Sequence, residues 1–149
     1  MSEAWLSFLH ISAFLGWVVF ASSQAALCRS EWLNAAAVQR LVRLDGILWI
    51  ASAAVLLTGL ARIYWGVKGS AWYWGNGLLH LKLTLFLVVA LLQIGPGRQY
   101  RRWQAALQAG RGLPPEGEIR GARRLVMIAT HLVALIPLAA VFLARGFGG

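Results

Sequence analysis

Three histidines, His10, His80 and His131, lie in stretches of sequence that are otherwise almost entirely apolar. An imidazole in such a stretch can coordinate a metal or a haem iron, or it can hydrogen-bond between helices. Carrying an ionisable group into hydrocarbon costs on the order of 3 kcal/mol, so such groups warrant a functional hypothesis. A single histidine is as often a hydrogen-bonding residue as a ligand, but three on separate segments favour a shared site.

The segments that carry these histidines have the length and composition of membrane spans. Hydrophobic residues make up 59% of the 149 residues, charged residues 13%, and the mean hydropathy is +0.65. Long apolar runs predict helices at about 4–27, 46–63, 77–94 and 125–144, because the backbone must hydrogen-bond within each segment inside a bilayer. The sequence therefore predicts an all-α fold, a single domain over 1–149 that forms an antiparallel bundle of four transmembrane helices.

A removable signal peptide is the alternative for the first run. The residues Met1–Glu3 lack a basic region and the apolar run is too long, so we expect the first helix to be retained. Cys28 is the only cysteine, which excludes an intramolecular disulfide and a thiolate metal cluster.

The net charge of +9 is distributed unevenly along the chain. Ten of the 14 basic residues lie between the first and second predicted helices or between the third and fourth, in the segments 28–45 and 95–124, which an even number of spans places on one side. They are Arg29, Arg40, Arg43, Arg98, Arg101, Arg102, Arg111, Arg120, Arg123 and Arg124. The positive-inside bias predicts that both segments are cytoplasmic and that both termini lie on the non-cytoplasmic side. This explanation makes nucleic-acid binding unnecessary.

The two connecting regions differ in character. The segment 64–74 is rich in tryptophan and tyrosine, which favour the headgroup region of a bilayer. The segment 95–123 is predicted to be a long basic loop, partly ordered at best around "GRGLPPEGE". Within it, "RQYRRWQAALQ" predicts a short amphipathic helix lying on anionic headgroups.

The depths of the histidines can be compared from the helical rise. His10 lies roughly 9 Å and His80 roughly 5 Å below the same surface, on helices that face each other. This arrangement predicts two axial imidazoles on one haem iron. His131 enters from the opposite side, and it either binds a second group or pairs with His10 across a larger offset.

Neighbouring residues could complete a haem pocket. Gly16 and Trp17 share the helical face of His10, and small residues there permit close approach of a macrocycle. Arg62 and Lys82 are candidate partners for the haem carboxylates, since such charges are costly to leave unpaired. Two further candidates are Arg145 for the carboxylates and Met127 as a soft ligand. The alternatives are helix packing for Gly16 and Gly59, and a Lys82 that extends toward the interface.

The motifs "FLHISAFLGW", "LLTGLARIYW" and "LLHLKLTLF" resemble those of the HemJ family, which are haem-containing protoporphyrinogen oxidases of bacterial membranes. The resemblance implies that His10 is a haem ligand, that His80 and Lys82 form the matching pair on the third helix, and that Gly59 closes the second helix. Trp17 stands where these oxidases often have a tryptophan. The sequence departs from the pattern at Leu79, which replaces a tryptophan, and at His131.

A fuller resemblance covers nearly the whole chain. The segments "YWGVKG", "LLHLKLTLFLVVALLQIGP" and "HLVALIPLAAVFLARG" are similar to an uncharacterised bacterial family, a domain of unknown function grouped loosely with the CopD-like copper-resistance proteins. This resemblance implies a multi-pass protein of the bacterial inner membrane.

Three functions remain open on the sequence alone. The first is a b-type haem protein that exchanges electrons with a quinone or a redox protein and whose enzymatic activity, such as porphyrinogen oxidation, is left open. The second is copper handling, for which two methionines and one cysteine are few soft ligands. The third is a structural or partner-binding subunit without a cofactor, including a homo-oligomer. Catalysis by a serine–histidine–aspartate triad is not expected, since the single aspartate, Asp45, lies at the cytoplasmic end.

Overall fold

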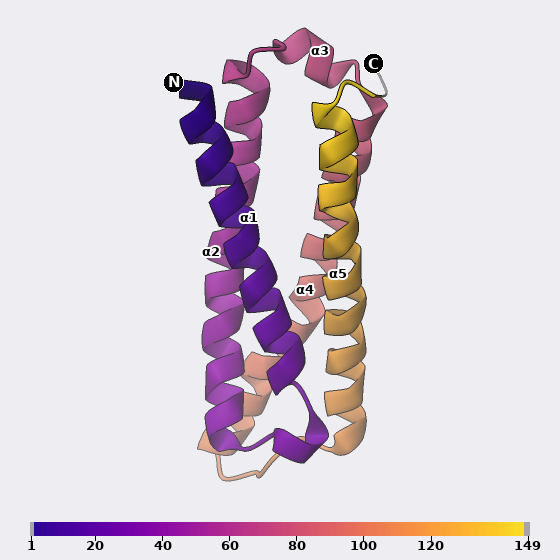
Figure 1. Cartoon of the computed structure of the whole chain (residues 1–149). Coiled ribbons are helices and arrows are strands. Elements are labelled where there is room, and N and C mark those ends of the chain that lie inside the picture. Colours follow the sequence, from indigo (N-terminus) through magenta and orange to yellow (C-terminus); the bar gives the residue numbers. More distant parts are fainter. Residues whose placement is uncertain (1, 148–149) are drawn as a thin grey trace.

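Residues 2–147 are described by a computed structural model, and their secondary structure is entirely helical (Figure 1). The four long helices are α1 (Ser2–Leu27), α2 (Ala35–Trp65), α4 (Gly77–Gln108) and α5 (Glu116–Ala144). Two short helices lie in the connections, the 3-10 helix η1 (Ser30–Trp32) and α3 (Ser70–Trp74). All four long helices are long and apolar enough to cross a membrane.

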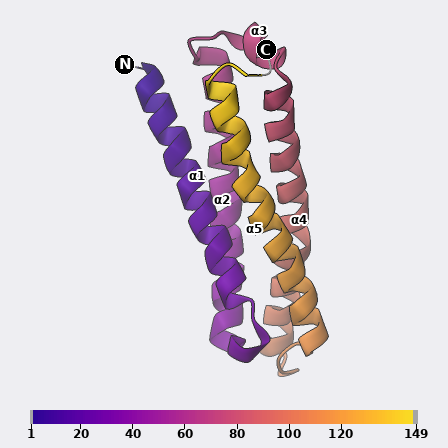
Figure 2. The same cartoon turned by 45° about the vertical axis from the view of Figure 1, so that its right-hand side comes forward.

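The four long helices pack antiparallel, as the sequence predicts. The α1–α2 pair and the α4–α5 pair form two closely packed hairpins, and these meet where α2 contacts α4 and α1 contacts α5 (Figures 1 and 2). Ser2 and Phe147 lie at the same end of the bundle, which we call the termini end. The opposite end carries η1 and the α4–α5 turn together with most of the arginines, and we call it the arginine-rich end.

The helices extend well beyond the predicted spans at the arginine-rich end. α2 begins at Ala35 rather than near 46, α4 continues to Gln108 rather than 94, and α5 begins at Glu116 rather than 125. The predicted long loop over 95–123 is therefore wrong, and so is the surface helix at "RQYRRWQAALQ", which continues α4. Apolar side chains on the extended turns pack together, and this burial favours helix over loop. They include Leu41, Tyr100, Trp103, Ile119 and Ala122.

Helix starts are fixed by side chains at their ends. The Asn34 side chain accepts a hydrogen bond from Ala37 N at 2.8 Å and begins α2. The Asn76 side chain accepts from Leu78 N at 2.9 Å and begins α4. α5 begins after Pro115 with Glu116 and Glu118 in its first turn, where negative charge is favourable.

Large apolar side chains are exposed around the bundle. Ile50 is 72% exposed and Leu57 67%, on the outer face of α2, and Leu138 of α5 is 57% exposed. Water would make such a surface unfavourable, whereas lipid accommodates it. The buried core is divided along the axis into a cluster at each end and an apolar middle layer that includes Trp17, Val55 and Val89.

The aromatic segment between α2 and α4 closes the termini end. Lys68 Nζ donates to the carbonyl oxygens of Leu143 and Ala144, at 3.4 and 3.1 Å, and lies 4.0 Å from the centre of the Trp72 ring. The Asn76 side chain donates to Phe147 O at 3.0 Å. These contacts hold the end of α5 against the connection between the two hairpins.

Candidate ligand-binding site

His10 projects from α1 into the bundle near the termini end and is only 6% exposed. Its Nδ1 lies 2.9 Å from Thr58 Oγ1 of α2, and the Thr58 hydroxyl is 2.6 Å from Ala54 O. Because a hydroxyl has a single proton, which goes to Ala54 O, it can only accept from His10. This network assigns the proton to Nδ1 and leaves the lone pair on Nε2. Nε2 is therefore the atom of His10 that could bind a metal.

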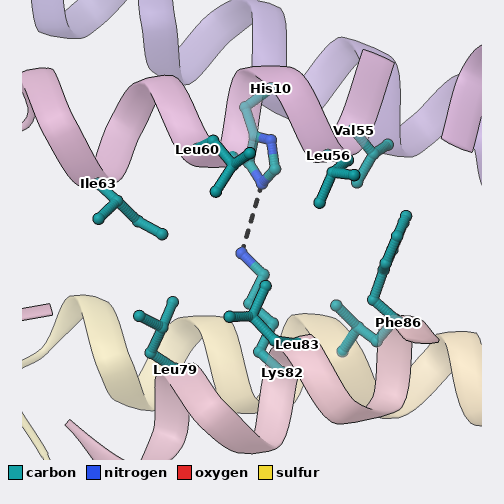
Figure 3. Close-up of a pocket in the computed structure, with 11 residues that line it drawn as sticks. His10, Val55, Leu56, Leu60, Ile63, Leu79, Lys82, Leu83 and Phe86 are labelled. Carbon is teal, nitrogen blue, oxygen red and sulfur yellow. Dashed lines mark hydrogen bonds between the residues drawn. The ribbon is translucent and has the colours of Figure 1, made fainter. Parts of the chain in front are cut away.

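Lys82 of α4 faces this lone pair across the space between the hairpins (Figure 3). Its Nζ lies 3.4 Å from His10 Nε2, a distance at which the ammonium group donates a long hydrogen bond. The contact joins α1 to α4, which stand diagonally opposite in the bundle. His10 and Lys82 thus mark the place where both hairpins contribute to one interior site.

The lack of a side chain at Gly59 leaves space for the His10 imidazole. A Cβ at Gly59 would lie 3.2 Å from His10 Cε1, closer than ordinary van der Waals contact. The absence of a side chain therefore allows the imidazole to lie against the α2 backbone, next to Thr58.

Two small cavities flank the His10–Lys82 contact. One, of about 40 Å³, is bounded mainly by apolar side chains, among them Val55, Leu83 and Phe86. The other, of about 60 Å³, extends toward the termini end and is bounded by Arg62, Tyr73 and Leu143. His10, Gly59, Ile63, Leu79 and Lys82 line both. The site is therefore apolar on one side and basic on the other.

The charged side chains at this site are basic. Lys82 lines both cavities and Arg62 lines one, and no carboxylate is among the described residues that line them. Unpaired positive charge in a membrane interior is costly, so it marks a place where an anionic group would be stabilised. The site suits a ligand that is largely apolar and carries negative charge at one edge.

His80 and His131 do not join His10. His80 is exposed on α4, where its Nε2 donates to Trp74 O at 2.9 Å. His131 is exposed on α5, with Nδ1 donating to Met127 O at 2.6 Å. Within residues 2–147, no group of three or more histidine, cysteine or acidic side chains is placed to hold a metal ion. The predicted facing pair of His10 and His80 is wrong in this structure.

His80 points away from the site because it is two residues from Lys82 in the sequence "HLK". Residues two positions apart on an α-helix point about 200° apart around its axis. His80 and Lys82 therefore cannot both face the interior, and the structure turns Lys82 inward. Depth along the helix axis therefore does not decide whether a histidine faces the site.

The remaining predicted residues lie at other positions. Trp17 is completely buried but packs against Phe14 and Phe86 in the middle layer. A Cβ at Gly16 would meet no atom within 4 Å, so this glycine is not needed for a close approach. Arg145 is exposed at the end of α5. Trp17, Gly16 and Arg145 do not line the two cavities.

Two residues of the site were not predicted. Thr58 orients His10 and directly precedes Gly59. It is four residues before Arg62 and therefore lies on the same face of α2, a spacing that the sequence contains. Tyr73 belongs to the aromatic segment 64–74, which the sequence predicts to lie at the headgroup region of the bilayer. The fold of the α2–α4 connection brings its side chain to the cavity.

Comparison with protein families gives one match. The family described as "Predicted membrane protein (DUF2214)" matches residues 2–148, nearly the whole chain. No curated protein and no solved structure matches. The match agrees with a multi-pass membrane protein with four candidate spans.

Proposed function

The chain belongs to the DUF2214 family of predicted membrane proteins, and we propose that it binds haem b in the termini-side half of its bundle and transfers electrons. The observation that carries the proposal is the buried lone pair of His10 Nε2, oriented by Thr58 and facing the interface of the two hairpins. Low-spin haem in a helical bundle needs such an imidazole, held in one tautomer by a second hydrogen bond.

The donor set fits a haem in three respects. His10 offers a nitrogen ligand, Lys82 lies opposite it, and Arg62 lines the cavity toward the termini end, where it can pair with the carboxylates of the macrocycle. The apolar cavity on the other side suits the hydrocarbon edge. Cavities of about 40 and 60 Å³ hold only a few water molecules, so a macrocycle enters only if α2 and α4 move apart.

The roles of the residues follow from these positions. Bound haem would supply one-electron transfer. Thr58 holds the His10 imidazole in place, Lys82 is the side chain available on the opposite face, and the apolar residues exclude water. A quinone or a redox protein is the proposed electron partner, and an anionic porphyrinogen is a substrate compatible with the same basic and apolar surfaces.

We further propose that the protein lies in the bacterial cytoplasmic membrane with its arginine-rich end in the cytoplasm. The support is the positive-inside bias of the ten arginines at that end. The site then lies in the outer half of the bilayer, and both termini are outside.

A copper site has less support. Copper would require several nitrogen or sulfur ligands. Among the described residues that line the cavities, His10 is the one histidine, and there is no cysteine or methionine.

The test is absorption spectroscopy of the full chain purified in mild detergent from haem-replete cells. The wild type is expected to show a Soret band and a reduced α-band of low-spin haem b. His10→Ala removes both, whereas His80→Ala, the matched control on α4, leaves them unchanged because its ring lies outside the site. Lys82→Met keeps haem but changes the spin state.

Two outcomes contradict the proposal. A colourless wild-type protein favours a structural subunit without a cofactor. A spectrum that depends on His80 as much as on His10 would show that His80, and not Lys82, holds the haem together with His10.

A further inference from the structure

A second group of buried polar residues lies in the arginine-rich half, away from His10. Its members are Gln24 of α1, Asp45 of α2, and Gln93 and Tyr100 of α4, which are between 0 and 5% exposed. Each has an atom without a hydrogen-bond partner, namely Gln24 Nε2, Asp45 Oδ1, Gln93 Oε1 and the Tyr100 hydroxyl. Four such groups in one part of a bundle are unusual, because buried polar groups in folded proteins are normally hydrogen-bonded.

Asp45 connects this group to the surface. Its Oδ2 accepts from Arg101 Nη2 at 2.8 Å, and the Arg101 side chain is 61% exposed. Its Oδ1 is the unpaired atom and faces the interior. A Cβ at Gly97 would lie 2.7 Å from both carboxylate oxygens, so the glycine allows the carboxylate to lie against α4. The Asp45 carboxylate therefore has one oxygen on the exposed Arg101 guanidinium and the other buried inside the bundle.

A small cavity borders Gln24 and Gln93 on the side toward the middle of the bundle. Its volume is about 10 Å³, close to the space needed for one water molecule. Gln24, Gln93 and Thr130 contribute polar groups to its wall.

Two prolines add unpaired carbonyls near the same cavity. Pro96 lies inside α4 and Pro137 inside α5. A proline lacks an N–H, so the carbonyls four residues earlier, those of Leu92 and Val133, lose their intrahelical donor. Both residues line the cavity. Hydrogen-bond acceptors thus outnumber donors here. A buried water molecule can supply the missing donors.

We propose that these residues hold a short file of water molecules that enters beside Arg101 and ends at Gln93, with the Asp45 carboxylate accepting hydrogen bonds from water at the solvent end. Water supplies the missing donors to Asp45 Oδ1, Gln93 Oε1 and the two free carbonyls. The titratable and charged groups that face Asp45 are Arg101 and Tyr100 of α4, and the neutral Gln24 faces it from α1.

The file is separate from the haem site. Gln93 and Lys82 are eleven residues apart on α4, about 16 Å along the helix. Trp17, Val55 and Val89 fill the space between them as part of the apolar middle layer. The inference therefore does not rest on haem binding, and the two proposals can fail independently.

The test is cysteine accessibility in the full chain, reconstituted in lipid nanodiscs. Cys28 is completely buried and burial raises the pKa of its thiol, so the native cysteine reacts slowly, and Cys28→Ala removes it as a background. Gln93→Cys is introduced, with Val89→Cys as the buried control one turn further along and Leu91→Cys as the lipid-facing control. In D₂O the S–H infrared band of Gln93→Cys is expected to convert rapidly to S–D, and that of either control slowly.

A second measurement uses the native residue. Infrared spectra recorded on changing H₂O to D₂O are expected to show a rapid shift of a carboxylate stretching band that Asp45→Asn removes, because the hydrogen-bonding water is replaced. A Gln93→Cys S–H band that does not exchange, exchange at Val89→Cys at the same rate, or an Asp45 band that does not shift would each overturn the water file.

Discussion

At the scale of single residues, the candidate site is defined by which side chains face inward. His10 is oriented by Thr58 and lies against the backbone at Gly59. His80, despite its place in a motif that resembles haem-binding oxidases, hydrogen-bonds to Trp74 O outside the site. The identity of a residue therefore says less about its role here than its direction on the helix.

Two glycines give a matched test of this close packing. In Gly59→Ala the new methyl group meets His10 Cε1 at 3.2 Å, which is expected to lower stability by about 1 kcal/mol and weaken haem binding. In Gly16→Ala the methyl group meets open space, so stability is expected to stay the same or rise by up to about 1 kcal/mol. Thermal unfolding in detergent measures both, and equal effects would show that Gly59 has no special contact with His10.

At the scale of helices, the two asparagines that cap helix starts make different sets of hydrogen bonds. Asn34 is exposed and begins α2 through one hydrogen bond. Asn76 is completely buried, begins α4 and also donates to Phe147 O at the end of α5. The second cap therefore fixes both a helix start and the contact between the α2–α4 connection and the end of the chain.

The difference predicts an order of stability losses. Asn76→Ala is expected to cost about 2 kcal/mol, because it removes both the cap of α4 and the hydrogen bond to Phe147 O at the end of α5. Asn34→Ala is expected to cost about 0.5–1 kcal/mol, as an exposed cap does. Denaturation midpoints in detergent compare the two variants, and the idea fails if Asn34→Ala is the more damaging.

At the scale of the whole molecule, two hairpins share one interior with two polar regions and an apolar layer between them. The basic site near the termini end collects His10, Arg62 and Lys82, while Asp45 and its neighbours lie near the arginine-rich end. The middle layer around Trp17 keeps these regions apart. This arrangement allows the two halves to bind different groups, an anionic ligand in one and water in the other.

The orientation proposed for the bundle gives a prediction at this scale. With both termini outside, a protease added to intact spheroplasts is expected to remove a tag fused to either terminus, whereas a tag inserted in the α4–α5 turn is protected until the membrane is opened. Immunoblotting of the tags measures this. Protection of both terminal tags would reverse the orientation and place the His10 site in the inner half.

The sequence by itself determined the class of fold and the number of long helices. Apolar runs of about twenty residues have no other stable form in a bilayer, so composition and length were sufficient. The limits of the helices toward the arginine-rich end were not determined in this way. Beyond the hydrocarbon both loop and helix are stable, and only the packing of residues such as Tyr100 on Leu41 decided for helix.

The candidate site was predicted in part. His10, Arg62, Lys82 and Gly59 were identified from their residue types in apolar segments, and the tertiary structure brings them together. The choice of Lys82 over His80, and the buried Asp45, Gln24 and Gln93 group, depended on how each helix is rotated about its axis. That rotation is set by side-chain packing between helices far apart in sequence, which the pattern of one segment does not contain.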